Sequence, residues 1–227
     1  MVLMCVLGVT VVPTGPDTAG AQDGLLKMVK QKRPSLPQPD PFDEKLPAKG
    51  RFLVASPNLS DPRFRETVVL LIDYGAGGAT GLIINRPSRV KLSELFPDEP
   101  GLKERTDIVY YGGPVEGRQM LMLIRAGEKP EESVHVFGDV YVSTSKNTLE
   151  RMVGSHKPDK QLRLYAGYAG WMPGQLNGEV ARGDWLIVRA DARSIFESDA
   201  SGIWDELIQR GSVIQVLNRN AQSRSWD

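Results

Sequence analysis

The segment from Gly167 to Leu176 constrains the fold of this chain more than any other. It reads GYAGWMPGQL and follows a strand-like run, Leu162–Ala166. Its three glycines give access to positive φ, and its proline fixes φ, so the backbone is directed by residue type rather than by side-chain packing. The composition therefore predicts a loop with a fixed backbone path directly after a strand.

Three further segments accompany it in a fixed order. They are Asp61–Leu71 (DPRFRETVVLL), Gly78–Pro87 (GATGLIINRP) and Val109–Val115 (VYYGGPV). Together with the glycine-rich segment they make the chain resemble the YqgE/AlgH family of bacterial proteins, over about residues 50 to 210. The resemblance implies a compact α/β domain, commonly labelled a transcriptional regulator, without a settled biochemical activity.

The charge balance argues against a nucleic-acid binder. The chain has 28 basic and 28 acidic residues, and six of the basic and five of the acidic ones lie before residue 51. The remainder thus has a net charge of −1. Proteins that bind nucleic acids usually carry a basic surplus, because neutralising phosphates supplies much of their affinity. DNA binding is therefore disfavoured, and a local basic patch is the alternative.

The N-terminal residues have several features of a signal peptide. Val2–Val12 is largely apolar and is too short for a membrane span, which needs about 20 residues. Ala19-Gly20-Ala21 fits a cleavage site, but no basic residue precedes the apolar run. Residues 1–21 are interpreted as a signal peptide, with a disordered leader as the alternative. Export to the periplasm is expected, with a cytoplasmic location as the alternative and no transmembrane anchor.

The rest of the chain divides by composition. Residues 22–50 contain five closely spaced prolines, which favour an extended linker. Residues 51–217 are expected to form one domain, and residues 218–227 a polar tail. Because Cys5 is the single cysteine, no intrachain disulfide and no thiolate metal cluster can form.

Hydrophobic patterns predict more strands than helices. Continuous apolar runs at 67–73 and 79–85 flank a glycine-rich turn and predict a hairpin of strands buried on both faces. Helices are expected at 92–96, 145–153, 175–181 and 203–209, and further strands at 51–55, 107–111, 120–124, 134–137, 140–142, 161–166 and 185–188. This order predicts a mixed α+β domain with a largely antiparallel sheet packed by helices.

No residue pattern in the sequence identifies a catalytic or metal site. His135 and His156 are the two histidines, and neither lies in a metal-binding spacing. The sequence has no G-x-S-x-G elbow and no P-loop. Neither a metal nor a cofactor is expected. His135 alternates with two valines and is interpreted as an exposed strand residue.

The loop motifs offer candidate binding residues, each with a structural alternative. Pro87 favours an extended Arg86, so the Arg86 guanidinium either anchors an anion or bonds loop carbonyls. Gly112 and Gly113 form either an anion-binding nest or a sharp strand exit. The structural alternative is favoured for both motifs. Sites are often built on loops set on a rigid scaffold, and one shared cleft is predicted. Its candidate residues are Asn85, Arg86, Gly112, Gly113, Gly167, Gly170 and Gln175.

Two expectations concern the glycine-rich segment itself. Trp171 is either a partner-binding aromatic or a core residue beneath the loop, and the core position is favoured. Gln175 is expected in the first turn of the following helix, within reach of the loop backbone.

The favoured function is a non-enzymatic binding or regulatory protein with an unknown protein or small-molecule partner. A hydrolase or transferase with a site near Arg86, His135 and the glycine-rich segments is the alternative, and it requires Arg86 and His135 to share a cleft. A third hypothesis is a transcriptional regulator that acts without strong direct DNA binding.

Overall fold

The structure is a computed structural model that describes residues 46–103, 106–154 and 162–210. The expected leader, most of the expected linker, the 218–227 tail and His156 lie outside the described residues. Residues 46–50 already contact the domain, because the Gly50 N–H donates a hydrogen bond to the carbonyl oxygen of Leu71, at 2.8 Å.

Ten strands lie in the described part of the chain and form one sheet. They are β1 (Arg51–Ala55), β2 (Val68–Gly75), β3 (Gly78–Ile83), β4 (Pro87–Lys91), β5 (Ile108–Tyr111), β6 (Val115–Arg125), β7 (Ser133–Phe137), β8 (Val140–Ser143), β9 (Leu162–Trp171) and β10 (Trp185–Arg189).

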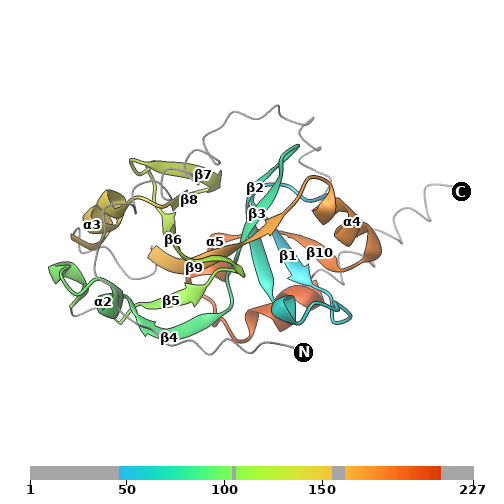
Figure 1. Ribbon diagram of the computed structural model, residues 1–227, viewed down its shortest axis with the longest axis horizontal. Coiled ribbons are helices and arrows are strands. Elements are labelled where there is room, and N and C mark those ends of the chain that lie inside the picture. Colours follow the sequence, from blue (N-terminus) through green and yellow to red (C-terminus); the bar gives the residue numbers. More distant parts are fainter. Residues whose placement is uncertain (1–45, 104–105, 155–161, 211–227) are drawn as a thin grey trace, which may run out of the picture.

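The sheet is curled and almost wholly antiparallel. Its main path runs β10-β1-β2-β3-β9-β6-β8-β7, with β5 joined to β9 and β4 joined to β5. The β5–β9 pair is parallel, and the remaining described pairs are antiparallel. In Figure 1, β9 crosses the middle of the molecule between β1 and β10 on one side and β7 and β8 on the other. The expected mixed α+β class is confirmed, and the fold is rich in strands.

Strand β9 corrects the expectation of a loop after Ala166. Its first half pairs with both β5 and β6, and its second half, Ala169–Trp171, pairs with β3. The strand thus continues through Gly167 and Gly170 to Trp171. Glycine inside a strand can mark a close approach of another backbone, and sequence alone does not distinguish that from a loop.

The α-helices are α2 (Leu92–Leu95), α3 (Lys146–Gly154), α4 (Gln175–Arg182), α5 (Ala192–Phe196) and a helix over residues 203–210. In Figure 1, helices α2 and α3 lie at the left of the sheet, α4 lies at its right, and α5 is labelled near the middle. Helix α4 ends before Gly183, whose φ of 83° suits a glycine at a helix C-terminus. None of the described helices is long and apolar enough to cross a membrane.

The core consists of three apolar clusters separated by the sheet. Along β2, Val68, Leu70 and Ile72 belong to one cluster, whereas Val69 and Leu71 belong to another. Because successive side chains point to opposite faces, the continuous apolar run is explained by burial on both faces, as predicted. The third cluster lies under α3, where Leu149, Met152 and Val153 are buried on the predicted helix face.

Candidate functional site

Asn85 and Arg86 hold the loop that precedes β2. Asn85 accepts a hydrogen bond from the Val68 N–H and donates one to the carbonyl oxygen of Glu66, both at 2.9 Å. The Arg86 guanidinium donates to the carbonyl oxygens of Arg63, at 2.6 Å, and Arg65, at 3.1 Å. These contacts support the structural interpretation of Asn85-Arg86-Pro87.

Two segments of the backbone cross closely at three glycines, Gly112, Gly113 and Gly167. The Gly112 N–H donates to the Ala166 carbonyl oxygen at 2.8 Å, and the Gly112 carbonyl accepts from the Ile83 N–H at 2.8 Å. A Cβ on Gly113 would lie 2.1 Å from the carbonyl carbon of Tyr168. A Cβ on Gly167 would lie 2.6 Å from the Gly113 carbonyl oxygen. The glycines allow this close crossing, which supports the structural role of the Gly-Gly-Pro turn.

The end of the glycine-rich segment packs around Trp171, which is 6% exposed. The indole N–H groups of Trp171 and Trp185 both donate to Oε2 of Glu179, at 2.8 Å each. Gln175 accepts a hydrogen bond from the Met172 N–H, at 3.1 Å, as expected for a bond to the loop backbone. The expected core position of Trp171 is confirmed.

Phe64 connects this aromatic cluster to the loop held by Asn85 and Arg86. Its ring stacks on Trp171 at a centroid distance of 6.2 Å and meets the Trp185 ring edge-on at 5.6 Å. The loop that Arg86 fixes therefore supplies a ring to the Trp171 cluster. Gly170 is exposed, and its added Cβ would meet only ordinary contacts. Ligand binding by the seven predicted residues stays a prediction.

Arg86 and His135 do not share a cleft. His135 is exposed on β7, as expected, and its Nε2 donates to the carbonyl oxygen of Gly138 at 2.9 Å. Arg86 directly precedes β4, and Figure 1 shows β4 at the bottom of the molecule and β7 at its top. The pairing that the hydrolase or transferase hypothesis requires is therefore wrong.

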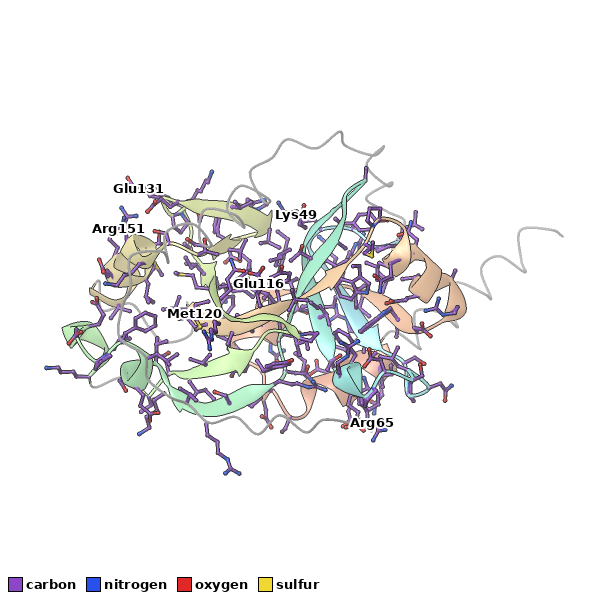
Figure 2. All side chains as sticks on the ribbon, in the orientation of Figure 1. Lys49, Arg65, Glu116, Met120, Glu131 and Arg151 are labelled. Atoms are coloured by element: carbon purple, nitrogen blue, oxygen red, sulfur yellow. The ribbon has the colours of Figure 1, made fainter. Side chains whose placement is uncertain are left out.

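A pocket of about 540 Å³ lies elsewhere, between β6, α2 and the start of α3. Figure 2 labels Met120 and Glu116, two of its lining residues, at separate places along β6. The apolar part of the wall is formed by Phe96, Met120, Leu121, Met122, Leu149 and Leu164. Such a mainly apolar cavity with a few polar groups is typical of small-molecule sites.

Gln119 is the unusual polar residue of this wall. Both amide atoms, Oε1 and Nε2, are covered and have no hydrogen-bond partner within the described part of the chain. A buried polar group without a partner costs about 1–3 kcal/mol. Gln119 lies in the part of β6 where pairing with β9 is irregular, between Val115 and Met120. The structure thus keeps an unsatisfied amide beside an apolar cavity.

The comparisons with known proteins agree with one another. A family profile described as AlgH-like matches residues 52–214. The chain belongs to the YqgE/AlgH family. A relative from Chromobacterium violaceum, called a UPF0301 protein, is 39% identical over 158 residues, covering 68% of this chain and 84% of the relative. A relative from Burkholderia cenocepacia with the same description is 40% identical over 159 residues, covering 66% and 81%.

Two solved structures have the same fold as this YqgE/AlgH domain. The solution structure of the AlgH protein from Pseudomonas aeruginosa superposes with a TM-score of 0.56 at 32% identity, covering 71% of this chain and 85% of that one. A crystal structure from Corynebacterium diphtheriae superposes with a TM-score of 0.62 at 24% identity, covering 73% and 87%. The second likeness concerns the fold alone.

Charges around the pocket of this family member are balanced. Lys146 at the rim pairs with Glu150 at 3.0 Å and with Glu99 at 3.8 Å. The Glu150 carboxylate, through its hydrogen bond and charge, raises the pKa of Lys146, which therefore stays protonated. Arg118 and Glu116 add one charge of each sign to the wall. Among the described residues, the pocket consequently has no cationic surplus to attract an anion.

Tyr165 is a fully buried titratable group in the domain and does not line this pocket. Its hydroxyl is fully covered and has no hydrogen-bond partner of good geometry among the described residues. Burial raises the pKa of Tyr165, against the opposing charge of Arg163, so the phenol stays protonated and is unsuited to act as a base. In the described ranges, no three His, Cys, Asp or Glu side chains gather closely enough to hold a metal ion.

The pocket residues were not predicted as a site from the sequence. Met120–Ile124 was recognisable as an apolar strand, but the polar stretch Glu116–Gln119 before it is equally typical of a surface turn. The burial of Gln119 depends on the irregular pairing of β6 with β9, which no local pattern indicates.

Proposed function

We propose that this member of the YqgE/AlgH family is a non-enzymatic binding or regulatory protein that holds a small ligand in the pocket between β6, α2 and α3. The observation that supports the proposal most strongly is the unpartnered Gln119 amide in the wall of an otherwise apolar cavity. Buried polar groups are normally hydrogen-bonded, so an exception beside a cavity points to a missing partner. A bound ligand supplies that partner.

Binding fits the pocket better than catalysis does. Its titratable side chains, Glu116, Arg118 and Lys146, are exposed, and Lys146 is already paired with two carboxylates. Groups that act as acids or bases at neutral pH are usually shifted by burial or by a like charge. The apolar wall and the amide instead provide shape and hydrogen bonding. A regulatory role would follow from coupling this occupancy to a protein partner.

We expect Met120→Trp to abolish small-molecule binding, because the larger ring would occupy the pocket. The measurement is native mass spectrometry of protein incubated with a small-molecule extract of bacterial cells. Wild-type protein should carry an added mass, and the variant should not. Leu95→Trp is the matched control, since Leu95 is 45% exposed on α2 and does not line the pocket. Equal added mass on all three proteins would contradict the proposal.

We also propose that the chain is exported and that its mature form begins near Gln22. The support is the apolar run Val2–Val12 followed by Ala19-Gly20-Ala21. Intact-mass analysis of protein from the native host is expected to show a chain that lacks residues 1–21. A mass that includes Met1, together with recovery in the cytosolic fraction, would reject export.

A further inference from the structure

We propose that the ligand of this pocket is neutral and carries a planar group with a hydrogen-bond donor beside an acceptor, which pairs with both amide atoms of Gln119. Carboxamides, lactams and the edges of nucleobases share this chemistry. The inference deepens the proposed function and rests on it. It names the class of ligand by the group that Gln119 can recognise.

The Gln119 amide sets the first requirement. Its Nε2 donates and its Oε1 accepts, and both atoms lack partners in the described structure. A group with an adjacent acceptor and donor meets both atoms at once, as glutamine does with the edge of adenine. A carboxylate satisfies Nε2 alone and repels Oε1, whereas a cation satisfies Oε1 alone.

The charges around the pocket set the second requirement. Lys146 lies 3.0 Å from Glu150 and 3.8 Å from Glu99, so carboxylates already neutralise it. Arg118 and Glu116 on the same wall balance each other in formal charge. An anionic ligand would lose hydration in the apolar cavity without meeting a surplus of positive charge. A neutral ligand avoids that loss.

The shape and composition of the wall set the third requirement. Phe96, Leu149 and Leu164 offer a fixed apolar surface, and Met120 and Met122 adapt to irregular shapes. The ligand therefore has an apolar body next to its polar group. Because both amide atoms of Gln119 are covered, they reach the ligand by rotation about the side-chain bonds. Binding thus repositions Gln119.

The test uses three fragments with the same aromatic body: phenylacetamide, phenylacetate and ethylbenzene. Each is titrated into ¹⁵N-labelled full-length protein and followed by NMR. Phenylacetamide should bind roughly tenfold more tightly than the other two, since each of them leaves at least one amide atom unpaired. The side-chain NH₂ signals of Gln119, assigned by their loss in Gln119→Glu, should shift with phenylacetamide.

Titrations with adenine and uracil form the second part of the test. They show whether the polar group of the ligand belongs to a nucleobase or to a simple carboxamide. Tighter binding of a base than of phenylacetamide indicates a nucleobase ligand, and the reverse indicates a carboxamide or lactam. Either result supports the inference, provided that the Gln119 side-chain signals shift.

The Gln119→Glu variant reverses the expected preference. A glutamate is acceptor-only when ionised and forms bidentate pairs with planar cations. The variant should lose its preference for phenylacetamide and gain one for phenylacetamidine. Equal binding of all fragments to wild-type protein would overturn the inference while leaving the pocket as a ligand site. Absence of binding by every fragment and by cell extract would overturn the proposed function as well.

Discussion

Replacing Trp171 by alanine should lower the free energy of unfolding by about 3–5 kcal/mol, the usual loss for a buried aromatic side chain. Trp171 is 6% exposed, stacks on Phe64 and donates its indole N–H to Glu179. Its removal leaves a cavity between Phe64 and Trp185 and takes one donor from a carboxylate that serves both tryptophans. The loss of packing and the loss of the hydrogen bond both lower the free energy of unfolding.

Thermal unfolding checks this expectation. A loss of 3–5 kcal/mol lowers the Tm of a domain of this size by about 6–20 °C. Met172→Ala is the matched control, because the neighbouring side chain is 74% exposed. Surface substitutions usually change stability by no more than about 0.5 kcal/mol. If the two variants melted at the same temperature, Trp171 would not support the core.

The sequence predicted those parts of the fold in which local pattern and tertiary burial agree. The apolar run of β2 is buried on both faces, and its hairpin with β3 forms across the glycine-rich turn. Helix α3 buries Leu149, Met152 and Val153 as their spacing predicts. In each case a single segment carries enough information, because its period and its turn residues point to the same structure.

Strand β4 and the end of β9 were not predicted, because their local sequences do not resemble strands. Strand β4 (Pro87–Lys91) is mostly exposed. It contains one proline, one serine and two basic residues, so its pattern resembles a loop. It is a strand because it pairs with β5. The part of β9 from Gly167 onward resembles a loop because of its two glycines, yet Ala169–Trp171 pairs with β3. Both strands are determined by tertiary pairing rather than by propensity.

The candidate site was predictable in part for a related reason. The motif residues Asn85, Arg86 and Gly112 do lie near one another, because Arg86 accepts a hydrogen bond from the Tyr111 N–H and Gly112 accepts one from the Ile83 N–H. The hydrogen bonds of these residues are internal to the fold. The pocket draws its wall from α2, β6, α3 and β9, which are far apart in sequence. The unpartnered amide of Gln119 is therefore evident only in the folded structure, where these elements come together.

Gly112→Ala should destabilise the domain by about 3 kcal/mol, the upper part of the usual range for overpacking. An added Cβ would lie 2.3 Å from the Gly167 carbonyl oxygen and 3.1 Å from Cβ of Tyr165. The Gly167 oxygen belongs to the backbone of β9, so relief requires movement of the strand that joins both halves of the sheet. Gly112 does not have a positive φ, so the expected loss is purely steric.

Urea unfolding measures the effect against Gly127→Ala. Gly127 also lacks a positive φ, but nothing lies within 4 Å of its added Cβ. Alanine there restricts the unfolded chain and should stabilise the domain by up to about 1 kcal/mol. The two alanine variants are therefore expected to change stability in opposite directions. A Gly112→Ala protein as stable as Gly127→Ala would mean that β5 and β9 do not cross this closely in solution. The glycine motif would then require a role in ligand binding rather than in backbone packing.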